Sequence, residues 1–519
     1  MIHEINLVVT PKQASDNKFL KPILASKLKI EINEITFITI LKKSIDARSK
    51  NVKINLRLKV GINQDFVPEP REIISYQNVE NKPEVIIVGA GPGGYFAALR
   101  LLELGLKPIV FERGKDVDER KKDLYNIHSK GVLNSSSNYS FGEGGAGTFS
   151  DGKLYTRSKK RGSIKKILEI FHNHGADEKI LIDSHPHIGT NKLPKIIANI
   201  RETIIKHGGQ VYFNHCVTDF IIDKDTIKGV FVNDKKYFAK AVILATGHSA
   251  RDIYSKLYDK KIYLEFKPFA MGVRLEHPQE LIDQIQYHSP QGRGKYLPAA
   301  EYNFVTQINN RGVYSFCMCP GGVVVPASTG ENQQVVNGMS SSGRNSKFSN
   351  SAMVVEIREE DLKKYGNFGP LAGMKFQEYY EELSYKAGTD KLEAPAQRMV
   401  DFVSNTRSKN LPKSSYKPGI VSSELHKWIP SEIRHRLQEG FKVFGKKSRG
   451  FLTNEALLLG VESRTSAPVR ITRNKEDLQH IEIKKLFPCG EGAGYAGGIA
   501  SAAIDGERCA QKVAQVLNL

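Results

Sequence analysis

The chain has 519 residues, of which 40% are hydrophobic and 25% charged, which excludes a disordered or fibrous protein and suggests about two to four globular domains. The formal net charge of +20 comes from 76 basic and 56 acidic residues, and the lysines are spread along the chain. This pattern favours a lysine-rich surface over a dedicated nucleic-acid partner, although RNA stays an alternative.

The cellular compartment is predicted from the termini, the apolar runs and the cysteines. The N-terminus has no basic segment before its apolar residues, so we expect no signal peptide. No apolar run reaches the roughly 18 residues that a membrane-spanning helix needs. Five cysteines in so long a chain argue against a disulfide framework. We therefore expect a cytoplasmic protein with no membrane span.

Residues 1–80 are predicted to form a small α+β domain. The stretch 15–30 is typical of a helix after a serine or aspartate N-cap. In 50–61 apolar and charged residues alternate, which predicts a strand with one solvated face. The polar stretch 66–83 carries three prolines and is expected to be a linker.

A dinucleotide-binding unit is predicted from EVIIVGAGPGGYFAALRLLELGLKPIVFE, residues 84–112. A buried strand, a glycine turn, a helix and a second strand follow one another. The pattern G-x-G-x-x-G allows a tight turn and close approach of the backbone to a pyrophosphate at the helix N-terminus. Glu112 ends the second strand, where a carboxylate can accept hydrogen bonds from both ribose hydroxyls.

A second glycine-rich stretch, FGEGGAGTFSDGKL at 141–154, has five glycines in fourteen positions. It is too rich in glycine for a stable helix or strand. Main-chain amides there could approach a pyrophosphate and a flavin, with Thr148 and Ser150 adding hydroxyls. We interpret the stretch as a loop that closes over the cofactor.

Two later segments indicate a flavin rather than a nicotinamide as the bound cofactor. The strand ILATG at 243–247 ends in a turn that can approach a cofactor. The tail GEGAGYAGGIASAAIDG at 490–506 places Glu491 near ribityl hydroxyls and a helix N-terminus near the flavin N1–C2=O edge, where negative charge develops on reduction. The alternative for the tail is a turn followed by a packing helix.

These segments together resemble the FAD-dependent oxidoreductases that have a single dinucleotide fold. Within them the chain is most similar to a bacterial family of poorly characterised FAD-dependent dehydrogenases. The resembling stretches include HPHIGTNKL (185–193), VYSFCMCPGGVVVPAS (313–328), NGMSSSGRNSKFSNSA (338–352) and GVESRTSAPVRI (460–471). The resemblance implies FAD as cofactor and an oxidoreductase activity, and it implies no particular substrate.

The expected cofactor-binding residues come from all four glycine-containing segments. They are Gly89, Gly91, Pro92, Gly93, Gly94, Glu112, Arg113, Gly144, Gly145, Ala146, Gly147, Thr148, Thr246, Gly247, Gly490, Glu491, Gly497, Gly498 and Ile499. No second G-x-G-x-x-G follows a strand in the middle of the chain, so NADH or NADPH is expected, if used, as a transient reductant. We expect no metal, since His185 and His187 lack further ligands at metal spacing.

The catalytic residues are less clearly indicated, because a flavin carries the hydride chemistry itself. The candidates are Cys317, Cys319, Arg464, Lys153 and His248. The two cysteines have the spacing of neither a thioredoxin-like nor a reductase site, and two buried cysteines on a strand are the alternative. Arg464 is either an anchor for an anionic substrate or for the flavin edge, or it belongs to an ordinary surface or structural ion pair.

The predicted fold class is α/β, with a discontinuous Rossmann-like FAD-binding domain, an inserted substrate or cap domain and the small N-terminal domain. The expected division is 1–80, 81–260, 261–449 and 450–519, the second and fourth segments forming the FAD domain. The predicted function is an FAD-dependent oxidoreductase acting on a small molecule, with no oligomeric state indicated. The alternatives are an RNA-directed flavoprotein in tRNA modification and a non-enzymatic flavin or nucleotide sensor.

Overall fold

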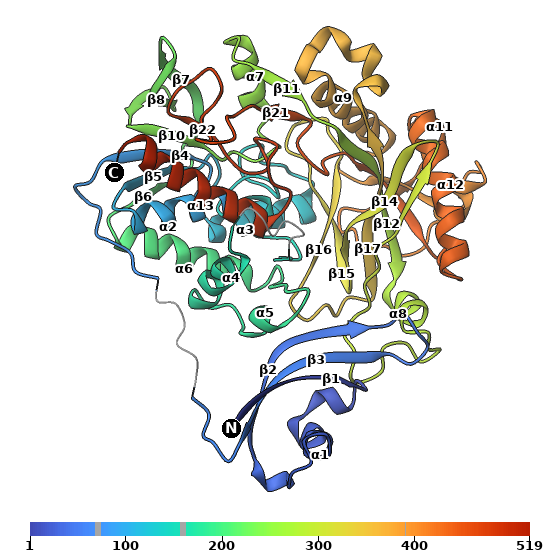
Figure 1. The fold of residues 1–519 in the computed structure, drawn as a ribbon. Coiled ribbons are helices and arrows are strands. Elements are labelled where there is room, and N and C mark those ends of the chain that lie inside the picture. The colour runs from blue at the N-terminus through green and yellow to red at the C-terminus, as the bar shows by residue number, and fades with distance from the viewer. Residues whose placement is uncertain (68–73, 156–161, 390, 519) are drawn as a thin grey trace.

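The computed structural model describes residues 1–67, 74–155, 162–389 and 391–518 (Figure 1). Its main layers are a small N-terminal sheet, a five-stranded parallel sheet and a seven-stranded mixed sheet, each with its own helices. This confirms the predicted α/β class with a Rossmann-type parallel sheet. Part of the predicted linker, residues 68–73, lies outside the described residues.

The N-terminal domain is a three-stranded antiparallel sheet in the order β1-β3-β2, with one helix on its apolar face. The predicted alternation holds, since Leu56 and Leu58 of the third strand are buried against that helix. The helix begins after Asp16, whose carboxylate accepts the backbone N–H of Lys18 at 2.9 Å. The elements are β1 (Ile2–Val9), η1 (Gln13–Ser15), α1 (Asn17–Leu28), η2 (Ile32–Glu34), β2 (Ile35–Asp46) and β3 (Lys53–Ile62).

The five-stranded sheet is parallel throughout, in the order β22-β10-β4-β5-β6. Its central strand, EVIIV, is apolar on both faces, as a parallel strand covered on both sides must be. Val85 and Ile87 face one layer, and Ile86 and Val88 face the other. The strands are β4 (Glu84–Val88), β5 (Lys107–Phe111), β6 (Gln210–Tyr212), β10 (Ala241–Leu244) and β22 (Leu486–Pro488).

Four helices cover the first face of this sheet: α2 (Pro92–Glu103), α4 (Ile164–Asn173), α6 (Leu193–Lys206) and α13 (Ile499–Val516). The other face is covered by α7 (Arg251–Asp259) and by an antiparallel sheet of β7 (Val217–Asp223), β8 (Thr226–Val232) and β9 (Lys235–Phe238). The same half of the chain holds α3 (Val117–Lys130), η3 (Gly145–Gly147) and α5 (Lys179–Ile182). The last helix of the chain, α13, packs directly along α2, the helix of the glycine fingerprint (Figure 1).

The seven-stranded sheet has the order β13-β14-β17-β12-β20-β18-β19 and is antiparallel except between β18 and β19. On β12, Met271, Val273 and Leu275 enter the core beneath α12, and Arg274 lies on the opposite face, toward β16. The strands are β12 (Phe269–Pro278), β13 (Val305–Ile308), β14 (Arg311–Cys319), β17 (Phe348–Ile357), β18 (Ala394–Arg398), β19 (Ile420–Ser422) and β20 (Leu457–Glu462).

Five helices and a 3-10 helix accompany this sheet: α8 (Gln279–Tyr287), η4 (Glu359–Leu371), α9 (Ala372–Ala387), α10 (Met399–Val403), α11 (Leu425–Trp428) and α12 (Ser431–Lys447). A separate hairpin of β15 (Gly322–Pro326) and β16 (Val336–Ser340) lies on the face that carries Arg274. That face is therefore polar where it approaches the hairpin.

The division of the chain into domains stays a prediction, but its boundary at residue 450 would cut the seven-stranded sheet. Strand β20 pairs with β12 and β18 inside that sheet. The next strand, β21 (Val469–Ile471), pairs instead with β11 (Leu264–Phe266), and β22 then joins the parallel sheet. A boundary after Glu462 keeps the sheet whole. Composition gives no sign of this, because β20 is as apolar as a strand of the parallel sheet.

The N-terminal domain contacts both larger regions through the end of β2 and the turn that follows it. The backbone N–H of Ser184 donates to the carbonyl oxygen of Lys43 at 3.1 Å, and a ring nitrogen of His288 lies 3.0 Å from the carbonyl oxygen of Ala47. Among the residues that the structure describes, no helix combines the length and the apolar composition that crossing a membrane would require.

Candidate functional site

The glycine fingerprint forms the turn between β4 and α2 as its spacing predicts. Gly89 has a φ of 104°, and a Cβ there would lie 2.5 Å from the carbonyl oxygen of Ala245. A Cβ at Gly94 would overlap the carbonyl oxygen of Gly89. Gly91 is the N-cap of α2 and offers no side-chain acceptor, so the first amides of the helix remain available to a phosphate.

Glu112 has a structural role that the sequence does not reveal. Its carboxylate is 5% exposed and accepts three backbone N–H groups, each at 2.9 Å, from Ala90, Gly114 and Gly142. A carboxylate has about four acceptor positions, so only one remains for a ribose hydroxyl in this arrangement. Glu112 therefore joins the fingerprint to the second glycine loop, and its expected bonds to both ribose hydroxyls stay a prediction.

The second glycine loop lies directly against the fingerprint. The backbone N–H of Gly144 donates to the carbonyl oxygen of Ala90 at 2.9 Å, and a Cβ at Gly145 would lie 3.2 Å from the Cα of Gly91. At the other end of the loop, a Cβ at Gly147 would lie 2.9 Å from a side-chain carbon of Ile499. One loop thus bridges the start of α2 and the start of α13.

The hydroxyl groups of this loop are engaged within it. Thr148 donates to the carbonyl oxygen of Glu143 at 2.9 Å, and Ser150 donates to that of Gly147 at 2.7 Å. Both hydroxyls therefore stabilise the loop conformation, and their expected contact with the cofactor stays a prediction. Among the other predicted contacts, Arg113 forms an ion pair with Asp252.

The two later segments complete the arrangement. A Cβ at Gly492 would lie 2.5 Å from the carbonyl oxygen of Gly247, so the turn after β10 and the tail loop are in contact. His248 lies 3.1 Å from a carboxylate oxygen of Glu491. Gly498 is the N-cap of α13 and has no side-chain capping bond, which leaves the amides of an 18-residue helix free at its start.

Space for a cofactor is indicated where glycines have open surroundings. A Cβ at Gly247, Gly497 or Gly498 would meet nothing within 4 Å. Other glycines of the same segments, such as Gly145 and Gly492, lie against neighbouring backbone, so the segments pack closely beside these open positions. A backbone-lined cradle with two helix N-termini fits a group with a pyrophosphate and a ring system that becomes anionic.

Three of the five catalytic candidates lie together at the seam between this cradle and the seven-stranded sheet. The ammonium group of Lys153 donates to the carbonyl oxygen of Met318, between Cys317 and Cys319. Cys319 is buried, whereas Cys317 is exposed, so the alternative of two buried cysteines is wrong for one of them. His248 is not part of this group and lies beside Glu491 of the tail.

Arg464 has no donor left for a substrate. All five of its N–H groups have protein acceptors: two go to the carboxylate of Glu381, and the other three go to Ser249, Thr329 and Gln333. The side chain is 8% exposed. Arg464 therefore belongs to a structural ion pair, and the geometry does not support a role as a substrate anchor.

Sequence reasoning missed several charged residues of the seam. Asp151 forms an ion pair with Arg344 at 2.7 Å, joining the second glycine loop to the loop after β16. Arg274 is fully buried on β12, with Glu462 at 3.4 Å. The only sequence signal for Arg274 is a cation inside an apolar strand, which does not identify its partners.

One further cluster contains ligand types that metals favour. The sulfur atoms of Cys489 and Cys509 and a carboxylate oxygen of Asp505 lie within 4.8 Å of one another. Both oxygens of Asp505 are already bonded by the guanidinium of Arg473, at 2.7 and 2.9 Å. The positive charge of Arg473 opposes a metal cation at this point, so the cluster is an ion pair beside two thiols.

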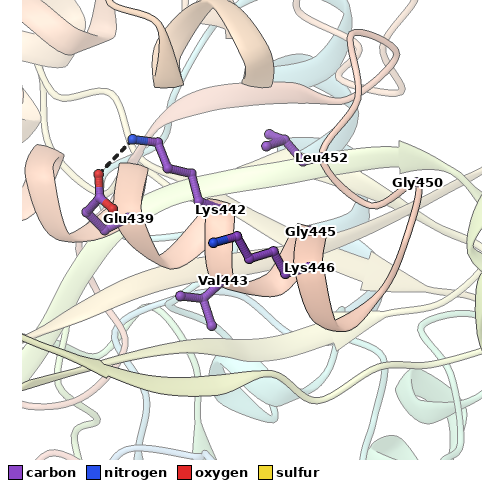
Figure 2. A pocket seen from close by; sticks show the side chains of 7 residues that line it. All are labelled: Glu439, Lys442, Val443, Gly445, Lys446, Gly450 and Leu452. Atoms are coloured by element: carbon purple, nitrogen blue, oxygen red, sulfur yellow. Dashed lines mark hydrogen bonds and ion pairs between the residues drawn. The ribbon is translucent and has the colours of Figure 1, made fainter.

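Two surface pockets lie away from the cradle. The pocket in Figure 2 has a volume of about 450 Å³ and is formed by α12 and the segment after it. Lys442 forms an ion pair with Glu439 on the same helix at 2.8 Å, and the lining contains none of the predicted site residues. A groove of about 620 Å³ lies between β11 and η4.

Comparison with known families agrees with this geometry. Residues 83–260 match the pyridine nucleotide-disulphide oxidoreductase family, and residues 268–465 match the FAD-dependent protein, C-terminal domain-like family. Residues 1–61 match a domain of unknown function. The first two matches meet close to the boundary between the parallel and the seven-stranded sheets.

Individual relatives are of three kinds. An uncharacterised protein from Clostridium beijerinckii is 41% identical over 537 aligned residues, covering 100% of this chain and 99% of that one. Human mitochondrial dihydrolipoyl dehydrogenase is 34% identical over 61 residues, 12% of each chain. The glycerol-3-phosphate dehydrogenase from Bacillus halodurans complexed with FAD has 13% identity and a TM-score of 0.37, covering 85% of this chain and 66% of that one. The chain belongs to a poorly characterised family of FAD-dependent oxidoreductases.

Proposed function

We propose that the four glycine-containing segments hold FAD, and that electrons pass between its flavin and a small-molecule substrate held against the seven-stranded sheet. The observation that carries this proposal is the mutual contact of the fingerprint, the second glycine loop, the turn after β10 and the tail, mostly through glycine backbone. When bound, the flavin supplies hydride and electron transfer.

Different segments of the chain would then contact different parts of FAD. The start of α2 would face the pyrophosphate, where free amides and the helix dipole favour negative charge. The start of α13 would face the flavin edge, and Gly145 and Gly147 would bring backbone between the two. The nineteen cofactor contacts expected from the sequence remain predictions, and each can be tested by substitution.

The electron donor in this proposal is NADH or NADPH, bound transiently. The matched families are described by FAD and by an oxidoreductase, which supports this proposal over an RNA-directed flavoprotein or a sensor. A cytoplasmic location stays our expectation from the five cysteines, all free in the structure.

The test is to identify the cofactor released from the purified chain and to follow the flavin spectrum after anaerobic addition of NADH or NADPH. We expect FAD, and bleaching by one nicotinamide in preference to the other. A colourless chain that takes up no FAD would overturn the proposal.

Gly145→Val tests the second glycine loop. Gly145 has a φ of 62° and faces the Cα of Gly91, so a β-branched residue is strained there. A backbone strain of about 1–3 kcal/mol should lower FAD affinity about 5- to 150-fold. The matched control is Gly366→Val, because a Cβ at Gly366 meets nothing within 4 Å. Full flavin content in Gly145→Val would show that the loop is merely structural.

A further inference from the structure

The three-stranded N-terminal sheet has two edges that differ in how the rest of the chain meets them. At the β2 edge, Lys43 forms an isolated bridge with Asp183, and the backbone N–H of Ser184 donates to the carbonyl oxygen of Lys43. Strand β1 is the opposite edge, and among the residues that the structure describes no strand or bridge pairs with its free side. Figure 1 shows β2 on the side of the sheet that faces the larger regions and β1 on the other side.

The two edge strands also differ in regularity. Strand β2 shifts register against β3 at two points, between Ile35 and Phe37 and between Ile40 and Lys42, and it carries two adjacent lysines. Strand β1 pairs with β3 along all its residues without a shift, contains no proline or lysine, and has a single carboxylate, that of Glu4. Bulges, lysines and prolines are the usual devices that prevent an edge strand from pairing further. Strand β1 has none of them and is therefore competent to pair.

The backbone groups on the free side of β1 follow from the ladder. Met1 and Ile62 exchange both of their backbone hydrogen bonds, at 2.8 and 2.9 Å. In an antiparallel ladder such pairs alternate with pairs whose N–H and C=O groups point away from each other. The groups that point away from β3 belong to Ile2, Glu4, Asn6 and Val8. For Asn6 a contact on that side is present, since its carbonyl oxygen accepts from the ammonium group of Lys27 on α1 at 2.8 Å.

The side chains of the same residues are exposed on the face of the sheet opposite α1. Ile5, Leu7 and Val9, which alternate with them, are buried in the core beneath that helix. Ile2 is 41% exposed and Val8 is 58% exposed. Along the strand the exposed residues are therefore apolar, acidic, amide and apolar in turn. This order is nearly the same in both directions, as a strand that pairs with its own copy across a two-fold axis requires.

One antiparallel register pairs the exposed residues of two copies in a complementary way. It places Ile5 of both copies at the two-fold axis, so that Ile2 lies opposite Val8 and Glu4 lies opposite Asn6. The apolar side chains at the two ends then cover each other, and the carboxylate of Glu4 faces an amide donor. Each of these pairs is a hydrogen-bonded pair, because the groups that point away from β3 in one copy meet those of the other.

The charges at the centre of this register are compatible with it. The two Glu4 carboxylates become diagonal neighbours, about 7–8 Å apart. Each already forms an ion pair with Arg57 of its own chain, on the adjacent strand β3. The repulsion between the two acids is thereby balanced, and Lys27 is exposed enough to leave the carbonyl oxygen of Asn6 to a backbone donor of the second copy.

We propose that β1 is a docking surface for the β1 strand of a second copy of this chain, so that two N-terminal sheets join into one continuous sheet. The two-fold axis is perpendicular to this sheet, and the two copies of α1 lie on the same face of it. The inference is independent of the proposed function, because no residue of β1 belongs to the cradle. It gives the N-terminal domain a role in assembly.

The first test is sedimentation velocity of the FAD-containing full chain over a range of concentrations. Because a single pair of strands is a small interface, we expect a reversible association whose sedimentation coefficient rises with concentration. The measurement is made at about 0.15 M salt, where charges more than about 8 Å apart are largely screened. A monomer at every concentration would overturn the inference.

Val8→Lys tests the apolar ends of the register. The substitution replaces both Ile2–Val8 pairs with a lysine opposite an isoleucine, and it should weaken the association about tenfold. The matched control is Val305→Lys, because Val305 is 61% exposed on β13, an edge strand of the seven-stranded sheet. The control should associate like the parent chain. Equal weakening by the two variants would mean that added charge, and not the β1 edge, is responsible.

Asn6→Pro tests the backbone of the edge. Its N–H points away from β3, so proline removes no hydrogen bond within the sheet and is tolerated as it is on other edge strands. In the joined sheet it removes a ladder donor from each copy, and we expect only monomer. Parental flavin content and a parental urea unfolding curve check that the chain is folded. A dimer that persists in both Asn6→Pro and Val8→Lys would place the interface elsewhere and overturn the inference.

The register is tested by disulfide crosslinking between two variants, Glu4→Cys and Asn6→Cys. Both also carry Cys216→Ser and Cys317→Ser, which remove the two cysteines that are not buried. Opposite residues of a hydrogen-bonded pair have Cα atoms about 5.5 Å apart, a distance that a disulfide spans. The mixture of the two variants should therefore crosslink readily, with the bond located by mass spectrometry of peptides.

Two controls belong to the crosslinking experiment. Either variant alone places its thiols in diagonal positions about 7–8 Å apart and should crosslink less than the mixture. Glu4→Cys mixed with Asn55→Cys should not crosslink, because Asn55 lies on the same face but on the central strand β3. Crosslinking of the Asn55→Cys mixture to the same extent as the first would show random collision and would contradict the proposed register.

Discussion

Two buried acid–arginine groups differ in how many arginine hydrogen bonds each carboxylate accepts. Glu381 on α9 accepts four N–H groups, two from Arg251 and two from Arg464, at 2.8 to 3.0 Å. Glu462 at the end of β20 has one arginine contact, with Arg274 at 3.4 Å. We call the first the Glu381 cluster and the second the Glu462 pair.

The difference appears as opposite shifts in pKa. Burial raises the pKa of Glu381, but Arg251 and Arg464 outweigh burial and hold it well below its usual range. Burial also raises the pKa of Glu462, and there it prevails over Arg274, so the value reaches about 7. A carboxylate with two forked partners is therefore a fixed charge, and one with a single long contact titrates near neutral pH.

The arginines of the two groups differ in the same way, in how completely their surroundings are paired. Arg464 has all its donors satisfied and joins α9 to the loop after β20. Arg274 donates to the carbonyl oxygen of Cys317 and to the side chain of Asn350, whose amide nitrogen has no hydrogen-bond partner among the described residues. The network around Arg274 is therefore less completely paired than that around Arg464.

Glu381→Gln should produce the largest effect. The amide leaves two buried guanidinium groups without a counter-charge, and removal of one partner of a buried ion pair costs about 3–5 kcal/mol. Urea unfolding followed by fluorescence of the only tryptophan, Trp428 on α11, measures the loss. The control is Glu378→Gln on the same helix, whose 4.0 Å contact with Arg251 should contribute less than about 1 kcal/mol.

The acid dependence of stability gives the same comparison a second readout. Because the pKa of Glu381 is depressed in the folded state, its contribution is present above the unfolded value near 4.5 and is lost as pH falls below it. Glu381→Gln should lack that part of the acid dependence. An unfolding curve with the parental acid dependence would contradict the role we give to the cluster.

Glu462→Gln should remove a pH dependence of stability whose sign is opposite to that of Glu381. A raised pKa means that the folded state binds the proton more tightly, so stability is present below about pH 4.5 and is lost as pH rises toward 7. The parent chain should lose about 1.4 kcal/mol per pH unit in this range through Glu462, and the glutamine variant should not. The difference between the two chains at pH 5, 6 and 7 measures it.

A constant difference between parent and Glu462→Gln across these pH values would show that the carboxylate stays charged. The two acids would then be alike, and the contrast between the cluster and the pair would disappear. The isosteric amide mimics the protonated acid, so little effect is expected at pH 5.

The cradle could be predicted from sequence, and the seam could not, for a physical reason. Backbone binding of a dinucleotide requires glycines at fixed local spacing, so Gly89, Gly91 and Gly94 identify it directly. The seam is made by side chains brought together by sheet pairing. Lys153 and Met318 are 165 positions apart, and nothing local to either indicates the other.

The prediction for Arg464 shows the same limit. Its surroundings, ESRTSAP, allow either an anchor or an ion pair, and the decision rests on Glu381, 83 positions away. Cys317 and Cys319 could be identified as candidates from sequence, but not that one is exposed and the other buried. The register shift in β14 causes this, because a bulge turns successive side chains away from strict alternation.

Arg464→Lys should have an intermediate effect. Lysine has three donors and lacks the planar fork, so the bidentate contact with Glu381 is lost, at a cost of about 1–3 kcal/mol. FAD content and the rate of flavin bleaching by the nicotinamide donor should remain parental. A parental unfolding curve with a raised KM for the donor or the substrate would instead restore Arg464 as an anchor.

Ser249→Ala should produce the smallest effect. Its hydroxyl accepts a 3.4 Å hydrogen bond from Arg464 and donates a 3.3 Å bond to Ser140, and both are long. We expect a loss of about 0.5–1 kcal/mol in urea unfolding, the net value of an ordinary hydrogen bond. The ratio of this loss to that of Glu381→Gln measures how far the carboxylate, rather than the surrounding hydroxyls, fixes Arg464. Equal losses in the two variants would mean that the charge of Glu381 contributes little, and the cluster would then resemble the Glu462 pair.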